Sequence, residues 1–330
     1  MEEMVKRGPL EKIKTVFVTG ANGFLGSHLI KRSLELGLEV IALIKEDIPD
    51  SIFSADGLSK SCRSIRGDLA DEGLIRDIFR QQRIDLCLHV GAQAIVTVAN
   101  SSPLGTLKAN IQGTWNILEA AREFKAGAIV VASSDKAYGE HKKLPYSEDS
   151  PLLALHPYDA SKACTDILAR AYAHTYNLLV AVTRCANIFG PGDLNFSRII
   201  PDTMRAVIKG RNPVIRSDGT PVRDYIYIDD VVRGYFILAD KLYSGKIPPG
   251  EAFNFGQNEP ISVIKLVKLI LRIAGNESLG PEILGKGKLK GEIDRQYLSS
   301  RKAKRMLGWQ PAFSLQGGLK RTYDWYKDNL

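Results

Sequence analysis

Short apolar runs alternate with segments of helical periodicity from residue 15 to residue 190. The runs are rich in Val, Ile and Leu without polar interruption, which is typical of strands buried on both faces. We expect strands at 15–20, 39–44, 85–92, 128–134 and 178–190. Apolar residues at helical spacing predict helices at 24–37, 74–82, 109–124 and 160–176. The alternation predicts an α/β fold with a doubly wound parallel sheet and helices on both faces.

The regular pattern breaks after the stretch GPGD (190–193), where Pro and Gly become more frequent. Residues 228–242 then have the pattern of a helix that packs on a sheet. A smaller domain interleaved with the first would explain both observations. Two domains are therefore predicted: 14–190 joined by 226–257, and a smaller one formed by 191–225 and 258–330.

Composition narrows the class of protein. The 330 residues include 44% apolar and 25% charged residues, as expected of a globular chain with a sizeable core. No apolar run approaches the roughly 20 residues of a membrane span, and the stretch MEEMVKRGPLEKIK lacks the apolar region of a signal peptide. We expect a cytoplasmic protein. The net charge is +8, but the basic residues are too scattered for a nucleic-acid interface. The four cysteines and five histidines are dispersed, so neither disulfides nor a metal site are predicted.

Glycines stand where the first predicted strand turns into the first predicted helix, in the stretch TGANGFLGSH. Gly20, Gly23 and Gly26 would let backbone N–H groups and the helix N-terminus approach a pyrophosphate. The spacing departs from G-x-G-x-x-G, and a tight turn alone would explain an isolated glycine triplet. Its place in the first strand–helix unit favours a dinucleotide site.

The choice between NAD and NADP depends on the residues that follow the second strand. An acid about 20 positions past the glycines is typical of NAD, and a base there is typical of NADP. Lys45, Glu46 and Asp47 stand together at this place. The pattern favours NAD slightly. The stretch GDLAD (67–71) would follow a third strand that lies between 44 and 67 and is not among those listed above, and its Asp68 would accept a hydrogen bond from the adenine amino group.

A second set of polar residues follows the predicted strand at 128–134, which ends in SSDK (133–136). Tyr158 and Lys162 lie four positions apart and share one face of a helix. A nearby ammonium would lower the pKa of Tyr158 and make it a usable base near neutral pH. Lys162 would also hold the nicotinamide ribose. An exposed helical pair is the alternative, but the order of glycine loop, polar strand end and Tyr-Lys pair favours a catalytic set.

Together these motifs resemble the extended short-chain dehydrogenase/reductases, and within them the nucleotide-sugar epimerases and dehydratases. The resemblance is carried by VFVTGANGFLGSHL, HVGAQ, NIQGTWNILEAAR, PYDASK, TRCANIFGPGD, VRDYIYIDDVV and KAKRMLGWQP. It implies a Rossmann-type domain that binds NAD or NADP and a smaller C-terminal domain that binds a nucleoside diphosphate sugar. It also implies a homodimer built by the helices around 106–124 and 159–176. Gly91 departs from the family, since many members have alanine there, and we expect the change to be tolerated.

The resemblance implies a role for each matching residue. The catalytic residues would be Ser134, Asp135, Lys136, Tyr158 and Lys162. The cofactor would contact Gly20, Gly23, Phe24, Leu25, Gly26, Lys45, Asp68, Leu69, Val90, Gly91, Ala92, Gln93, Asn110, Ser133, Tyr158 and Lys162. The substrate would be bound by Ser134, Asn187, Arg198, Arg223 and Glu292. Arg223 is the best candidate for the diphosphate, because a guanidinium fork matches phosphate oxygens. For Arg198 and Glu292 a surface salt bridge is the alternative.

The pair Asp135-Lys136 separates the possible activities. In epimerases of this family the two residues after the catalytic Ser or Thr are commonly small or neutral, whereas 4,6-dehydratases have an acid followed by a second titratable group. The pair is most like that of CDP-glucose 4,6-dehydratase, with GDP-mannose 4,6-dehydratase as a further relative. A nucleotide-sugar 4-epimerase and a catalytically silent NAD(P)-binding regulatory protein are the alternatives, and the pair itself would then be a surface ion pair.

A dehydratase assigns distinct work to the two residues. Asp135 would protonate the departing C6 hydroxyl. Lys136 would either remove the C5 proton as a free amine, with its pKa depressed by burial and by Lys162, or stay charged, pair with Asp135 and stabilise the enolate that forms when another base, such as a water, removes the proton.

Overall fold

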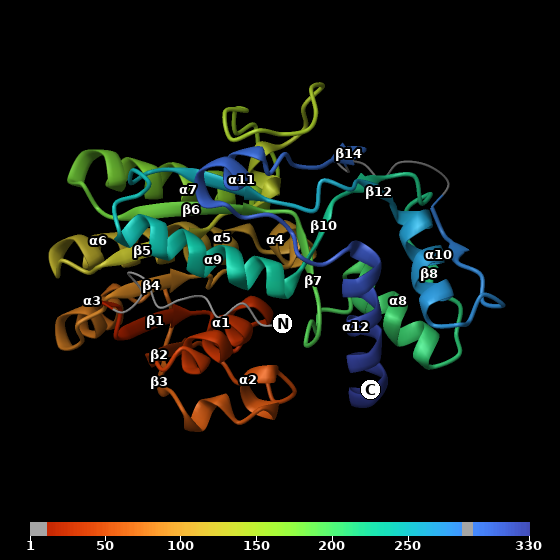
Figure 1. Ribbon diagram of the computed structural model, residues 1–330, viewed down its shortest axis with the longest axis horizontal. Coiled ribbons are helices and arrows are strands. Elements are labelled where there is room, and N and C mark those ends of the chain that lie inside the picture. The colour runs from red at the N-terminus through yellow and green to blue at the C-terminus, as the bar shows by residue number, and fades with distance from the viewer. Residues whose placement is uncertain (1–11, 286–292) are drawn as a thin grey trace.

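A seven-stranded parallel sheet forms the centre of the larger part of the molecule (Figure 1). The computed structural model describes residues 12–285 and 293–330. The strand order is β11-β6-β5-β4-β1-β2-β3, and every neighbouring pair is parallel. The strands are β1 (Thr15–Thr19), β2 (Glu39–Ile44), β3 (Arg63–Arg66), β4 (Leu86–His89), β5 (Ala128–Ala132), β6 (Val180–Cys185) and β11 (Ala252–Phe255). The predicted α/β class with a doubly wound parallel sheet is confirmed.

Helices cover both faces of this sheet, as the side chains of β1 illustrate. Val16 and Val18 belong to one buried apolar cluster, whereas Phe17 between them belongs to another on the opposite face. The first cluster includes side chains of α1 (Phe24–Glu35) and α9 (Ile228–Tyr243). The second includes side chains of α3 (Glu72–Gln81), α6 (Gly113–Glu123) and α7 (Pro157–Tyr176). Strands that are apolar on both faces therefore follow from burial on both faces.

Shorter elements connect the strands and helices of the sheet. They are α2 (Ile52–Ala55), the 3₁₀ turn η2 (Leu58–Lys60), α4 (Val96–Ser101), α5 (Pro103–Leu107), the π-helical turn η3 (Lys108–Gln112) and the 3₁₀ turn η4 (Asp135–Tyr138). The segment predicted as a helix over 109–124 is helical, but its start is the π-helical turn. Such turns are frequent at functional sites.

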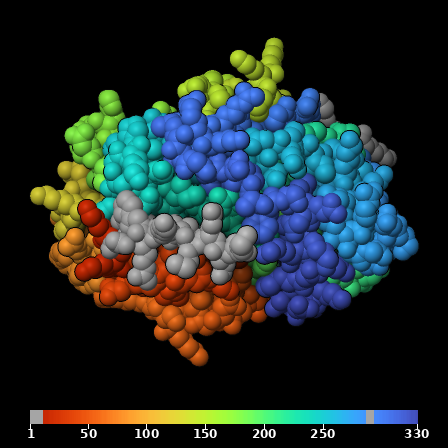
Figure 2. Space-filling view, in the orientation of Figure 1, coloured from red at the N-terminus to blue at the C-terminus, as the bar shows by residue number. Residues whose placement is uncertain are grey.

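A smaller set of elements lies to one side of the sheet, on the right in Figure 1. Its strands form small sheets of two or three: β7 (Asn187–Phe189) with β10 (Tyr225–Tyr227), β8 (Val214–Ile215) with β13 (Glu282–Ile283), and β12 (Ile261–Ser262), β9 (Val222–Arg223) and β14 (Arg295–Gln296). Its helices are α8 (Ile199–Ile208), α10 (Val263–Ile273) and α12 (Leu315–Asn329). Figure 2 shows the C-terminal segment, in blue, running over both the larger and the smaller part. Its helix α11 (Arg301–Leu307) lies over the sheet.

One predicted strand is wrong in detail. The run 178–190 forms two strands, because the backbone N–H of Asn187 turns to the carbonyl of Asp224 and β7 leaves the central sheet. The chain returns later through α9 and β11, which pairs with β6. The domain boundaries given above stay a prediction. Within the described residues, no helix is long and apolar enough to cross a membrane.

Candidate active site

A cavity of about 840 Å³ lies where the sheet meets the smaller part of the molecule. It opens at the carboxyl ends of the parallel strands, where open α/β sheets bind their ligands. Seventeen of the predicted residues line it: Gly20, Gly23, Phe24, Leu25, Gly26, Val90, Gly91, Ala92, Ser133, Ser134, Asp135, Lys136, Tyr158, Lys162, Asn187, Arg198 and Arg223. Predicted cofactor, catalytic and substrate residues thus share one cavity.

The glycine loop is packed so closely that side chains would not fit. Gly20 has a φ of 65°, and a Cβ there would lie 2.6 Å from the Cα of Gly91. A Cβ on Gly26 would lie 2.1 Å from the carbonyl oxygen of Gly20. Gly23 caps α1 without a side-chain hydrogen bond, which leaves the first N–H groups of the helix to a ligand. This cradle fits the pyrophosphate of a dinucleotide.

A buried histidine, which the sequence did not single out, supports the loop from behind. His89 Nδ1 is hydrogen-bonded to Thr19 Oγ1 at 2.8 Å, and the same oxygen accepts the backbone N–H of Gly91 at 2.9 Å. Burial lowers the pKa of His89 to about 3, so the ring is neutral at physiological pH. A Cβ on Gly91 would come within 3.0 Å of Thr19 Oγ1 and of the Gly20 nitrogen. The glycine at position 91 therefore suits this close packing.

The residues predicted for the adenine end lie outside the cavity and pair with one another. Lys45 Nζ lies 3.0 Å from Asp68 Oδ2, and both side chains are exposed. Although burial raises the pKa of Asp68, the N–H of Ala70 and the Lys45 ammonium outweigh this effect and hold it below its usual value. Asp47 likewise pairs with Arg66 at 2.7 Å. Contact of these residues with adenosine stays a prediction.

Three further predicted cofactor residues lie behind the cavity wall. Asn110, in the π-helical turn, accepts from the backbone N–H of Gln93 at 2.7 Å and donates to Ser161 Oγ at 2.8 Å. Leu69 packs under Gly91 and Gly113, where an added Cβ would meet its side chain at 2.7 Å. These residues hold the wall in place and do not line the cavity.

The polar strand end forms the floor of the cavity. Ser134 Oγ donates to Asp135 Oδ1 at 3.1 Å and accepts the backbone N–H of Lys136 at 3.2 Å, so it caps the 3₁₀ turn η4. Asp135 is 2% exposed, and its Oδ2 has no hydrogen-bond partner among the described residues. Burial raises the pKa of Asp135 above its usual range, and the Lys136 charge only partly offsets this. The carboxyl is therefore suited to hold a proton.

Tyr158 and Lys162 reach this floor from α7. Lys162 Nζ donates to the backbone carbonyl of Ala132 at 2.8 Å, and burial lowers the pKa of Lys162 to about 8. Burial raises the pKa of Tyr158 to about 12, and the Arg198 charge and a hydrogen bond with Ser134 only moderate that rise. The predicted lowering of the Tyr158 pKa is therefore wrong in direction. Desolvation of the phenol outweighs the nearby charges.

The predicted substrate residues come from the smaller part and its junction with the sheet. Arg223 is 9% exposed, and its Nη1 donates to the carbonyls of Val222 and Asp294 at 2.9 and 3.3 Å. Asn187 Nδ2 donates to the Asp224 carbonyl at 3.1 Å. Arg198 pairs with buried Asp193 at 3.0 Å, so the suggested salt bridge does exist, at the cavity rim. Glu292 lies outside the described residues.

The cavity also has lining residues that sequence reasoning missed. Apolar side chains from the loop after β4 and from α8 contribute, and so do polar groups near β8. They include Ile95, Val96, Asp193, Ile199, Ile200, Arg216, Ser217 and Tyr235. Ile95 and Val96 lie just past the predicted motif HVGAQ, after Ala94, and that motif is the one signal that could have marked them.

Comparison with known proteins identifies the family to which the chain belongs. The model of the NAD dependent epimerase/dehydratase family matches residues 16–256, and the chain belongs to this family. The dTDP-glucose 4,6-dehydratase of Streptomyces antibioticus is 31% identical over 95% of this chain and 92% of its own length. The family predicted from the sequence is thereby confirmed, together with its dependence on a nicotinamide dinucleotide, NAD.

Solved structures show the same fold at similar identity. The UDP-glucose 4-epimerase of Thermotoga maritima, solved with UDP-glucose, superposes with a TM-score of 0.86 at 29% identity and covers 95% of this chain and 99% of its own. DesIV, a dTDP-glucose 4,6-dehydratase from Streptomyces venezuelae solved with NAD, gives 0.84 at 30% identity over 96% and 97%. Both activities therefore occur among proteins similar to this chain.

Proposed function

We propose that the protein is a nucleotide-sugar 4,6-dehydratase, which converts a nucleoside diphosphate hexose into its 4-keto-6-deoxy form. The observation that carries this proposal is the buried Asp135 carboxyl, whose Oδ2 is unpaired within the described residues. It lines the same cavity as Ser134, Tyr158 and Lys136. Dehydration needs such a proton donor at C6, whereas epimerisation at C4 does not.

The glycine cradle would hold NAD, whose chemistry when bound is to take a hydride from C4 of the hexose and to return it at C6. Tyr158, which is hydrogen-bonded with Ser134, would take the proton of the C4 hydroxyl. Because its pKa is raised to about 12, little phenolate exists near neutral pH, and the rate of the C4 oxidation step should increase as the pH rises. The 4-ketone that forms acidifies the C5–H bond of the sugar.

Elimination of water would then depend on the first two residues of η4, Asp135 and Lys136. Asp135, whose pKa is raised by burial, would protonate the departing C6 hydroxyl. Lys136 would act either as the base that removes the C5 proton or as a charged group that stabilises the enolate. Its Nζ donates to the side-chain oxygen of Gln296, and its charge acts on Asp135. We favour the charged role, in which Lys136 stabilises the enolate while a water molecule acts as the base that takes the C5 proton.

The substrate would extend from η4 to the smaller part, with Arg223 as the candidate for the diphosphate. The Asp135-Lys136 pair is most like that of CDP-glucose dehydratase, whereas the similar proteins named above have dTDP or UDP in their names. The panel of nucleotide sugars described below therefore identifies the nucleotide and the hexose of the substrate.

A 4-epimerase is the second candidate, because the Thermotoga maritima enzyme has the higher of the two TM-scores. In that case Asp135 and Lys136 would take no part in proton transfer. A catalytically silent protein is disfavoured, since Ser134, Tyr158 and Lys162 are all present at the cavity.

One experiment separates these functions. The purified protein, supplied with NAD, is incubated with CDP-, dTDP-, GDP- and UDP-hexoses, and the products are weighed by mass spectrometry. A product lighter than its substrate by one water supports the dehydratase. A product of unchanged mass but different retention identifies an epimerase. No product from any sugar would point to the silent protein.

A further inference from the structure

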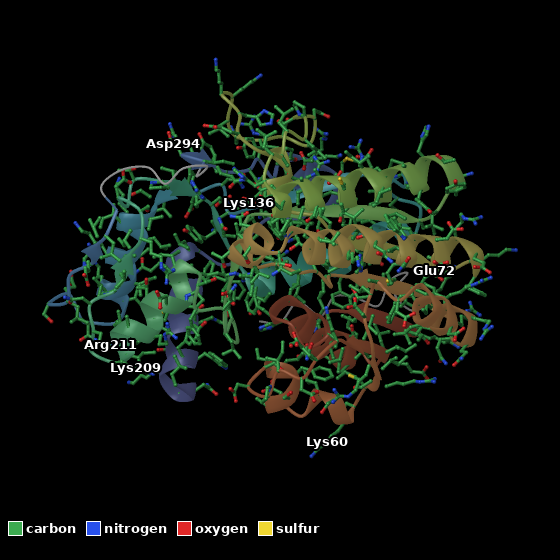
Figure 3. The ribbon with its side chains drawn as sticks, turned by 180° about the vertical axis from the view of Figure 1, so that it is seen from behind. Lys60, Glu72, Lys136, Lys209, Arg211 and Asp294 are labelled. Carbon is green, nitrogen blue, oxygen red and sulfur yellow. The ribbon has the colours of Figure 1, made fainter. Side chains whose placement is uncertain are left out.

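A buried glutamine from the smaller part reaches across to the catalytic strand end. Gln296 is 0% exposed and lies on β14, where it pairs in register with Arg223 of β9. Its Nε2 donates to the backbone carbonyl of Asp135 at 3.0 Å, and its Oε1 accepts from Lys136 Nζ. Figure 3 shows Lys136 at the junction between the two parts of the molecule.

The two hydrogen bonds fix the orientation of this amide. If the amide were reversed, its NH₂ would face the ammonium donor and its oxygen would face the Asp135 carbonyl, so both contacts would become repulsive. Buried polar side chains need hydrogen-bond partners, because a buried amide without them destabilises the fold more than an apolar side chain of the same shape. The amide of Gln296 therefore has one orientation here, with its oxygen toward Lys136 Nζ.

The contacts join segments that are far apart in the chain. Gln296 and Lys136 are separated by 160 residues. The small sheet that contains Gln296 also contains Arg223, the candidate for the diphosphate. The position of the Lys136 ammonium is thus linked to the strands expected to bind the substrate.

We propose that Gln296 is a positioning residue that holds Lys136 toward the reacting hexose and links that placement to the substrate-binding strands. Its effect on elimination rests on the proposed dehydratase function, but its effect on Lys136 does not. A neutral amide suits this role because it orients the ammonium without neutralising it.

The first test measures Lys136 directly and needs no substrate. Wild type, Gln296→Met and Gln296→Glu, each supplied with NAD, are treated with trace acetic anhydride over a range of pH, and acetylation of Lys136 is quantified by peptide mass spectrometry. Methionine has a similar length but loses both hydrogen bonds, whereas glutamate keeps an acceptor for Lys136. We expect Lys136 to react roughly 10-fold faster in Gln296→Met, the loss of one charged hydrogen bond, and no faster than wild type in Gln296→Glu.

A matched control removes a glutamine side-chain contact elsewhere in the chain. Gln257 Nε2 donates to the carbonyl of Phe313 at 2.9 Å, away from the cavity lining. Gln257→Met should leave Lys136 acetylation unchanged. Equal reactivity of Lys136 in wild type and Gln296→Met would overturn the proposal, provided that circular dichroism shows both to be folded. If Gln296→Met does not fold, Gln296→Glu decides instead. Acetylation of Lys136 that is faster in Gln296→Glu than in wild type would also overturn the proposal.

The second test uses the reaction. In Gln296→Met we expect kcat to fall roughly 10- to 100-fold while KM changes by less than about threefold, because Lys136 acts after the sugar is bound. A rise in KM with unchanged kcat would contradict a positioning role. If wild type dehydrates none of the sugars, the proposed function fails, and the acetylation result still decides the role of Gln296.

Discussion

Lys162 and Ala132 are joined by a hydrogen bond of 2.8 Å, from the lysine Nζ to the backbone carbonyl at the end of β5. One residue later, Ser133 Oγ donates to the backbone carbonyl of Lys162 at 3.0 Å. These reciprocal bonds fix the first turns of α7 to the strand end. They place Tyr158, one helical turn before Lys162, beside Ser134.

The buried position of Lys162 should be visible in the pH dependence of stability. Because its pKa in the folded chain is about 8, the unfolded chain binds more protons at this residue between about pH 8 and 10. Below about pH 8 the folded chain bears the full free-energy cost of burying the Lys162 ammonium. This cost decreases as the pH rises from about 8 to 10, because the folded chain then releases the proton. Lys162→Met should therefore stabilise the fold, relative to wild type, by roughly 1–3 kcal/mol more near pH 7 than near pH 10.

Urea denaturation at the two pH values measures this difference. Exposed Lys60, labelled in Figure 3, offers the control, since Lys60→Met should shift stability equally at both. A Lys162→Met effect that does not vary with pH would show that Lys162 is not the group that titrates.

Tyr158→Phe should lower kcat by at least about 100-fold, because the base for the C4 hydroxyl is removed. NAD content, measured by absorbance after denaturation, should stay at the wild-type level. Tyr172, on the same helix, hydrogen-bonds Glu119 at 3.0 Å away from the cavity lining, so Tyr172→Phe is the matched control. Near-normal turnover of Tyr158→Phe would remove this residue as the base.

Arg223→Ala should raise KM for the nucleotide sugar by roughly 30- to several hundredfold, the loss of one charge-assisted contact to a diphosphate. NAD content should not change. Arg272→Ala removes an exposed arginine whose pairing with Glu277 is loose, at 3.9 Å, and should leave KM unchanged. Steady-state kinetics of the two variants decide whether Arg223 touches the substrate, and an unaltered KM in Arg223→Ala would place it outside the site.

The sheet could be predicted from the sequence because its signals are local. Apolar runs such as 39–44 lie between helical patterns, and glycines mark the turn into α1. Strands of two residues, such as β9 and β14, are too short to show a periodic pattern. The small sheet that contains Arg223 and Gln296 was therefore not predicted. The contact of Gln296 with Lys136 arises only from tertiary packing. The direction of the Tyr158 pKa was missed for the same reason, since spacing shows a nearby lysine but not burial.

The homodimer expected from the family can be tested at the outer face of α6 and α7. Trp115 on α6 is 44% exposed and Ile167 on α7 is 56% exposed, although both are large apolar residues. If these helices form the contact, Ile167→Glu should convert a dimer into a monomer in sedimentation velocity. Leu155, in the loop before α7, is 90% exposed, and Leu155→Glu is the control that should leave the dimer intact. A wild-type monomer, or a dimer that survives Ile167→Glu, would contradict this contact.

Asp135→Asn gives the sharpest test of the dehydratase. Asparagine keeps the shape of the carboxyl and its contact with Ser134, but it has no proton to transfer to the C6 oxygen. We expect oxidation at C4 to continue, seen as transient absorbance of the reduced nicotinamide, while water elimination slows by about 100-fold or more. In wild type, elimination should also slow as the pH rises through the raised pKa of Asp135, since only its protonated form can donate.

A substrate with fluorine in place of the C6 hydroxyl supplies the control, because fluoride leaves without being protonated. Asp135→Asn should therefore release fluoride from it at close to the wild-type rate, whereas Lys136→Ala, which acts at C5, should remain slow with both substrates. Equal slowing of the hydroxyl and fluoro substrates in Asp135→Asn would show that the carboxyl does not act on the leaving group, and the case for a dehydratase over an epimerase would lose its main support.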